Sequence, residues 1–535
     1  MTAGVRRWGI TGLLAVAAAA LLLRTAWGPG HLLLVDAVFG PLPPPVTPDF
    51  SAPVRALQAG ATLLAGSRGG ALLFTAVLAL CFLAPAVLLR DLPWYARGAG
   101  ALLAGVNPWV YARMAEGQFG VVGAAAMLFL CVDAGRRLAA RPGPRPAAYL
   151  ALATCAALGF DPHFGGPLLL MGLVAAAWTR PWRRPGWTRW AVAAAVPPAL
   201  LVAAGAVAFA AASGHSGYAA VAGFGRQDFE LFRASADPDY GLVPGLVGLQ
   251  GYWAERLGRF PAALGRAGWW PVSWAVVVLA ALAGAWLRPA RGWLLPVGVV
   301  GLVVAASTAL PGGVDAAAWA AARLPLLAVY REPQKWSALW LLALVVLGAE
   351  AVGAVRVREL AHGARVVVAP ALAYLLALSV VLPAGLGIAE GWAVAVRPSG
   401  YPADWAAAAA YLRANVPPDD VVVVLPWHAY ERLDIAAGRL VSNPAVVVFP
   451  GRLLVPNNAE IPGRLTDDAA TLDIASASVG GEAGCELADA VRAHGARWAV
   501  VEPADGAEAD RGRLAACGFT VVQGRPGQVE VLRAA

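Results

Sequence analysis

Lysine occurs once in this chain, at position 335, against forty arginines. It belongs to the string Tyr330-Arg331-Glu332-Pro333-Gln334-Lys335-Trp336, just before an apolar segment. If this string is helical, Arg331 and Lys335 lie four residues apart and share a face, with Glu332 beside them. Two cations at a membrane edge suit a phosphate or pyrophosphate group. The alternatives are side chains that reach toward anionic lipid, and a lysine codon kept by chance in an arginine-rich chain.

A single acid, Asp36, lies in the apolar string that follows the first apolar segment. A carboxylate in such surroundings is costly unless it is paired, hydrated or functional. The functional interpretation is a general base or a metal ligand that faces a cavity at the membrane edge. The structural interpretation is a capping or loop aspartate, and the nearby Asp49 has the features of a helix cap.

Two further polar strings interrupt apolar segments. In the first, Asn107-Pro108 predicts a helix break, and Arg113, Glu116 and Gln118 follow within one or two turns. Arg113 and Glu116 are spaced to pair, and we expect them, with Gln118 and Glu332, to orient neighbouring groups. An anchor at the membrane interface would also explain the aromatic residues of this string.

The second string is Asp161-Pro162-His163. An aspartate and a histidine this close to a membrane could position an acceptor, shuttle a proton or bind a divalent metal. A complete metal site would need further ligands. A divalent metal is the only cofactor that these residues suggest. The structural interpretation is a proline turn capped by the aspartate.

The polar and aromatic residues of the C-terminal region could contact a glycan. The strand predicted at 421–425 runs into Trp427, His428 and Tyr430, and a second polar loop holds Asn457, Asn458 and Glu460. The carboxyl end of a strand is where α/β sheets place ligands. A structural loop packed on the membrane domain is the competing interpretation.

The elements that carry these residues must be membrane helices. The 535 residues are 59% hydrophobic and only 14% charged, where a soluble domain has about 25%. Apolar runs of the length needed to cross a bilayer predict about eleven spans. They fall near 8–27, 70–89, 98–111, 119–135, 147–160, 164–179, 190–212, 271–287, 292–310, 337–355 and 366–389.

Arginines cluster in alternate gaps between these runs, so the net charge of +8 indicates membrane orientation rather than nucleic-acid binding. The rule that positive loops stay inside predicts a cytoplasmic N-terminus and an extracytoplasmic C-terminus. We expect the protein to lie in the plasma membrane. The first run lacks a clear cleavage site, which favours an uncleaved span over a signal peptide.

The predicted organisation is an α-helical polytopic membrane domain over residues 1–390 and a C-terminal extracytoplasmic α/β domain over 391–535. Outer loops are expected at 28–69 and 213–270. Short apolar strands that alternate with helical patterns support the second domain. If it is extracytoplasmic, Cys485 and Cys517 could form a disulfide.

Taken together, the layout and the strings around Asp36, 107–118, 161–163 and 331–336 resemble the GT-C superfamily of integral-membrane glycosyltransferases. Within it, the chain is similar to actinobacterial arabinofuranosyltransferase-like and YfhO-like membrane proteins. The resemblance implies a polyprenyl-phosphate-linked sugar as donor and transfer on the outer face, with Asp36 at the position of the acidic residue that serves as catalytic base or metal ligand. The loops lack the Asp-X-Asp pair of some members, and the chain is much shorter than the large arabinofuranosyltransferases.

The sequence therefore predicts a membrane glycosyltransferase that transfers the sugar to a cell-envelope glycan or lipid. In it, Asp36 is the base, and Arg331 and Lys335 bind the donor phosphate. Two alternatives are a transporter or flippase of a lipid-linked or anionic substrate, and a non-catalytic GT-C-like envelope protein. The chain has no phosphate-binding loop, which argues against an ATP-driven pump.

Overall fold

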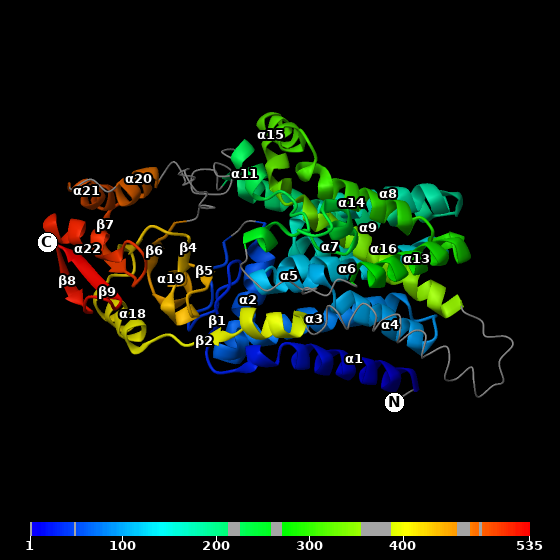
Figure 1. Cartoon of the computed structure of the whole chain (residues 1–535), viewed down its shortest axis with the longest axis horizontal. Coiled ribbons are helices and arrows are strands. Elements are labelled where there is room, and N and C mark those ends of the chain that lie inside the picture. Colours follow the sequence, from blue (N-terminus) through cyan, green and yellow to red (C-terminus); the bar gives the residue numbers. More distant parts are fainter. Residues whose placement is uncertain are drawn as a thin grey trace.

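The computed structural model describes residues 3–47, 50–211, 225–257, 270–354, 387–456, 471–480 and 484–535. A helical body forms one side of the molecule, and the C-terminal segment forms a smaller α/β unit beside one end of it (Figure 1). Asp49 and most of the span predicted at 366–389 lie outside the described residues.

Six helical segments within the described ranges are long and apolar enough to cross a membrane. They are Ala52–Leu88, Phe119–Ala140, Trp187–Ala208, Trp270–Leu287, Pro289–Ala309 and Pro333–Ala354. Several other predicted spans coincide with helices below that threshold, which are α1 (Ala3–Leu22), α4 (Trp94–Gly105), α5 (Pro108–Glu116), α7 (Pro144–Phe160) and α8 (Gly165–Thr179). The chain is a membrane protein, and its described part does not establish the predicted count of about eleven spans.

The apolar helices divide into inner and outer ones. In the inner helices α3 (Gly69–Leu88), α6 (Phe119–Ala140) and α16 (Ser337–Ala354), 72–83% of the most apolar window is buried. The value falls to 11% in α9 (Trp187–Ala211) and 33% in α13 (Trp270–Leu287). Helices that are apolar on all sides but exposed in the protein require an apolar solvent, which is the lipid.

Two sharp turns deliver polar residues to one end of the bundle. Asn107 caps α5, because its side chain accepts a hydrogen bond from the Val110 backbone N–H at 3.0 Å, so the predicted Asn-Pro break is confirmed. Gly117 ends α5 with φ of 98°, in the left-handed region that favours glycine. A Cβ at Gly117 would lie 2.8 Å from the backbone nitrogen of Ala37. The loop around Asp36 therefore packs directly on the turn between α5 and α6.

The α/β unit contains a five-stranded sheet in the order β6-β3-β7-β9-β8. Strand β3 (Val421–Leu425) pairs in parallel with β6 (Arg452–Leu454) and β7 (Ala496–Val501). Strand β9 (Glu530–Ala534) is antiparallel to β7 and to β8 (Phe519–Gln523). The unit also contains the helices α18 (Ala403–Asn415), α20 (Leu472–Gly480), α21 (Glu486–Ala493) and α22 (Ala507–Ala516). Cys485, at the start of α21, and Cys517, at the end of α22, form a disulfide.

The loop that carries Asp36 lies between the helical body and the α/β unit. Strand β1 (His31–Leu32) pairs with β2 (Pro398–Ser399), and Leu33 and Val38 are buried in the core of the α/β unit. A hairpin of β4 (Tyr430–Arg432) and β5 (Leu440–Ser442) touches the same loop, because the Ser442 backbone N–H donates to the Leu34 carbonyl at 3.2 Å. The position of Asp36 thus depends on both parts of the molecule.

Candidate active site

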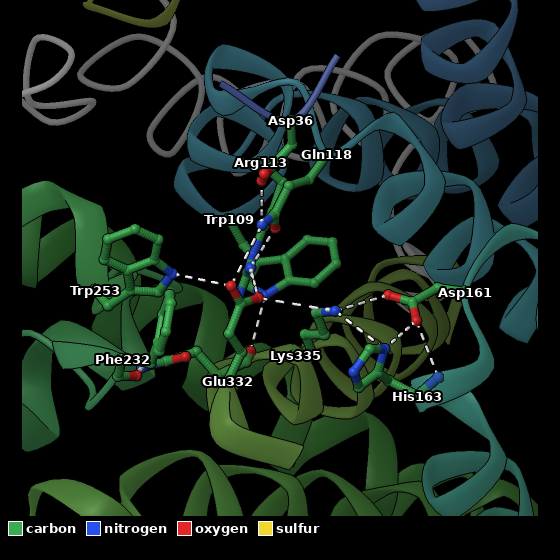
Figure 2. A network of polar contacts seen from close by, with 11 residues as sticks. Asp36, Trp109, Arg113, Gln118, Asp161, His163, Phe232, Trp253, Glu332 and Lys335 are labelled. Carbon is green, nitrogen blue, oxygen red and sulfur yellow. Dashed lines mark hydrogen bonds and ion pairs between the residues drawn. The ribbon is translucent and has the colours of Figure 1, made fainter. Parts of the chain in front are cut away.

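Lys335 lies at the centre of a buried polar cluster. It belongs to the short 3₁₀ segment Pro333–Trp336, immediately before α16, and is 9% exposed. Its Nζ lies 3.0 Å from Asp161 Oδ2, 3.2 Å from His163 Nδ1 and 3.8 Å from Glu332 Oε2 (Figure 2). The ammonium group thus joins two carboxylates that come from segments 171 residues apart.

Asp161 and His163 form a tight unit at the end of α7. The Asp161 side chain accepts from the His163 backbone N–H at 2.9 Å and also contacts the His163 ring Nδ1. Burial alone would raise the pKa of Asp161, but His163 and Lys335 hold it well below its usual range. The carboxylate is therefore charged, and the predicted turn capped by an aspartate is present as well.

Glu332 extends the cluster toward α5. Its Oε2 lies 2.9 Å from Arg113 Nη1, and its Oε1 accepts from Trp253 Nε1 at 3.1 Å. Arg113 is fully buried, with its guanidinium 4.1 Å from the centre of the Tyr252 ring. Burial opposes ionisation, yet Lys335 and Arg113 lower the pKa of Glu332 to about 2. Cations and carboxylates alternate along this part of the cluster.

Gln118 connects the buried cluster to Asp36. Its side-chain oxygen accepts from Arg113 Nη1, and its Nε2 donates to Asp36 Oδ2 at 2.7 Å. Asp36 is the exposed member, and its backbone N–H donates to the Glu116 carbonyl at 2.8 Å. One continuous chain of polar contacts therefore runs from exposed Asp36 through Gln118, Arg113 and Glu332 to Lys335 (Figure 2).

The predicted shared helical face of Arg331 and Lys335 is not present. One 3₁₀ segment ends at Arg331 and the next begins at Pro333, with Glu332 between them outside helical geometry. A proline restricts the residue before it to extended conformations, which explains the break. The Arg331 guanidinium lies 4.6 Å from the centre of the Phe232 ring. Arg113 forms an ion pair with Glu332, and the carbonyl of the buried Glu116 accepts from the Asp36 backbone N–H.

The cluster does not fit a divalent metal at Asp161 and His163. The Lys335 ammonium already lies within 3.2 Å of both side chains, where a metal ion would have to bind. A second positive charge at that point would be repelled, and an ammonium group cannot act as a ligand. Within the described ranges, no group of three or more histidine, cysteine, aspartate or glutamate side chains could hold a metal.

The candidate glycan contacts of the C-terminal region are only partly described. Trp427 is 2% exposed and packs in the core of the α/β unit, so its ring faces are not available for stacking on a sugar. His428 and Tyr430 are half-buried. Asn457, Asn458 and Glu460 lie outside the described residues.

The cluster is surrounded by an aromatic shell that was not predicted from the sequence. Trp253 donates to Glu332, Tyr252 lies under Arg113, and Trp109 donates its indole N–H to the Gln334 carbonyl at 3.1 Å. Gln334 in turn donates to the Phe232 carbonyl at 2.7 Å. The string Gln250-Gly251-Tyr252-Trp253, within the predicted outer loop 213–270, was the sequence feature that could have indicated it.

Comparison with known proteins gives a likeness in three dimensions only. No family model matches the sequence, and no curated protein matches it. The cryo-EM structure of arabinofuranosyltransferase AftD from Mycobacteria superposes with a TM-score of 0.67 at 16% identity, over 99% of this chain and 40% of AftD. The chain has a GT-C fold. The predicted resemblance is thereby confirmed at the level of the fold, and the chain spans about two fifths of AftD.

Two other superpositions are looser. A mutant form of AftD gives a TM-score of 0.54 at 16% identity, over 99% of this chain and 42% of that protein. ArnT from Cupriavidus metallidurans in the apo state gives 0.46 at 14% identity, over 99% of this chain and 98% of ArnT. The ArnT match is too loose to carry an argument. Identities this low leave the function to be inferred from the residues of the site.

Proposed function

We propose that this protein is a membrane glycosyltransferase that transfers a sugar from a polyprenyl-phosphate donor to a cell-envelope glycan or lipid. The observation that carries the proposal is the chain of contacts between exposed Asp36 and buried Lys335. It offers a carboxylate and cations at one end of an apolar helical bundle. A donor with an apolar tail and an anionic head needs that combination.

Asp36 is proposed as the general base that removes a proton from the acceptor hydroxyl. Asp36 is exposed, and Gln118 Nε2 donates to its Oδ2 at 2.7 Å. Gln118 is itself held by Arg113, so the carboxylate has a defined direction. Proton transfer by a positioned side chain contributes roughly 10²- to 10⁴-fold to the rate.

Lys335 and Arg331 are proposed to contact the donor phosphate and to stabilise the charge that develops on it as the sugar leaves. They lie on either side of Glu332, in the segment that leads into α16. A divalent metal has no part in the proposal, because the ammonium group of Lys335 supplies the positive charge between Asp161 and Glu332. We further propose an extracytoplasmic location for this end and for the α/β unit. The Cys485–Cys517 disulfide supports it.

A transporter of a lipid-linked or anionic substrate is the second candidate. Transport sites usually lie near the middle of the bilayer, between broken helices. Here Gln118 precedes α6, Asp161 follows α7, and Lys335 precedes α16, so the polar cluster lies at helix ends. This placement favours chemistry at the membrane surface.

Replacing Asp36→Asn tests the proposal. The substitution removes the base but preserves the shape of an exposed side chain, so insertion and folding should be unchanged. We expect sugar transfer in membranes, assayed with a radiolabelled polyprenyl-phosphate sugar, to fall by roughly 10²-fold or more.

The matched control is Asp419→Asn, another exposed aspartate in the α/β unit, which should retain full transfer. Normal transfer by the Asp36→Asn protein would rule out Asp36 as the base. Lys335→Arg separates a need for any cation from a need for lysine, since arginine keeps the charge but changes its geometry.

A further inference from the structure

A basic cavity lies at the end of the bundle away from the polar cluster. It has a volume of about 500 Å³ and is lined by Arg90, Arg137, Arg141, Arg145 and Tyr149, with Ala140 and Pro146. Helix α6 starts one residue after Gln118 and ends at Ala140, and α7 starts at Pro144 and ends one residue before Asp161. The cavity and the candidate active site are therefore separated by the full length of both helices.

The cavity carries an excess of positive charge. Asp133, which is fully buried, lies 2.6 Å from Arg90 and 2.9 Å from Arg137, so one carboxylate serves two of the guanidinium groups. Arg141 and Arg145 are exposed and have no ion pair among the described residues. Arg90 also lies 4.0 Å from the exposed Asp91, so four arginines against two aspartates leave a net charge of about +2 at this cavity. This charge favours an anion as occupant.

The surroundings of the cavity are those of a membrane interface. Leu138 and Ala147, beside the cavity, pack with Trp187 and Trp190 at the start of α9, and tryptophan is enriched at the level of lipid headgroups. On α7, Leu152 follows Tyr149 by three residues and is 71% exposed. An exposed apolar side chain therefore lies one helical turn beyond Tyr149, on the side where an acyl chain could pack.

We propose that this cavity binds the phosphate-bearing headgroup of an anionic membrane lipid. Arginine offers a planar fork that matches phosphate oxygens, and the Arg137 guanidinium already lies 5.2 Å from the centre of the Tyr149 ring, which orients it. Arg141 and Arg145 supply charge that the protein does not neutralise. A soluble phosphate has the same headgroup chemistry but gains nothing from the exposed apolar side chain beyond Tyr149.

The test uses the full-length protein in phosphatidylcholine nanodiscs with increasing fractions of phosphatidylglycerol, with bound lipid measured by native mass spectrometry. In Arg141→Gln/Arg145→Gln, we expect the affinity for phosphatidylglycerol to fall roughly tenfold or more, since each arginine near a surface is worth about a fivefold effect. The matched control is Arg180→Gln/Arg183→Gln, which removes equal charge from two exposed arginines between α8 and α9.

The control should change the affinity less than twofold. An equal loss in both double variants would overturn the proposal, because general surface charge would then explain the binding. Binding of soluble glycerol phosphate as strong as that of the lipid would also overturn it, since the site would then be for a free phosphate. The cavity variants retain Asp36 and Lys335, so sugar transfer can be measured separately.

Discussion

Two groups of carboxylates in this protein are buried, and they are stabilised in opposite ways. At the end of the helical body, Asp161 and Glu332 are buried with Lys335 and Arg113, so every carboxylate has a cation. In the α/β unit, Glu431 and Glu502 are buried together, and Asn443 Nδ2 donates to them at 3.3 and 3.0 Å. The first group stays ionised, and the second must share a proton.

The difference appears in the direction of the pKa values. Cations lower the pKa of Glu332 to about 2. Burial raises the pKa of Glu502 to about 8, although hydrogen bonds to Glu431 and Asn443 act in the other direction. Burial raises the pKa of both carboxylates, and the presence or absence of a neighbouring cation decides whether the group stays charged. The contributions of the two groups to stability should therefore depend on pH with opposite signs.

Lys335→Met should have the largest effect on stability. Methionine keeps most of the length of the side chain but removes the charge, which leaves Asp161 and Glu332 as buried carboxylates with fewer cations. Breaking a buried ion pair by removing one partner costs roughly 3–5 kcal/mol. We expect the free energy of unfolding in detergent, measured by denaturant titration, to fall by about that amount.

The control for Lys335→Met is Arg288→Gln at the other end of the bundle. Arg288 lies 3.4 Å from Glu350, has a half-exposed side chain, and leaves Glu350 paired with Arg291. Because Arg288 is half-exposed and the buried Glu350 keeps Arg291 as its cation, this loss should cost less than about 1 kcal/mol. Similar losses in the two variants would contradict the distinction between removing a buried cation and removing a half-exposed one.

Most members of the candidate site could be identified from the sequence, because charge is rare in an apolar chain. Asp36, Arg113, Gln118, Asp161, His163, Glu332 and Lys335 all stood out for that reason, and the structure joins them in one chain of contacts. The strand predicted at 421–425 is β3, because a run of valines bounded by polar residues is typical of a buried strand.

The partners within the site could not be predicted, since pairing depends on packing between distant helices. Arg113 had a candidate partner three residues away, yet it pairs with Glu332, 219 residues along the chain. Pro333 breaks the helix that would have aligned Arg331 with Lys335. The pair of Glu431 and Glu502 was missed as well, because nothing in the sequence indicates that β4 and the end of β7 meet at Asn443.

Acid should weaken the first group. The pKa of Glu332 is about 2 in the folded protein, below the ordinary 4.5, so its contribution to stability is present above about pH 4.5 and lost as pH falls toward 2. The shift corresponds to roughly 3 kcal/mol between about pH 6 and pH 2. Glu332→Gln should reduce this acid-induced loss in denaturant titrations, whereas Glu230→Gln, at an exposed pair with Arg233, should leave it unchanged.

Rising pH should weaken the second group. Glu502 keeps its proton in the folded state up to about pH 8, whereas the unfolded chain releases it near pH 4.5, so stability falls as pH rises through this window. Between about pH 6 and pH 8 the loss should be roughly 2 kcal/mol.

Hydrogen exchange at the amides of β3 and β7, corrected for the intrinsic rate, measures this loss of stability within the full chain. Glu502→Gln, which cannot ionise, should flatten this dependence, and Glu508→Gln on the exposed side of α22 should not. If the stability of Glu502→Gln fell with pH as steeply as that of the unchanged protein, the proton would be held by another group, because glutamine at this position cannot ionise.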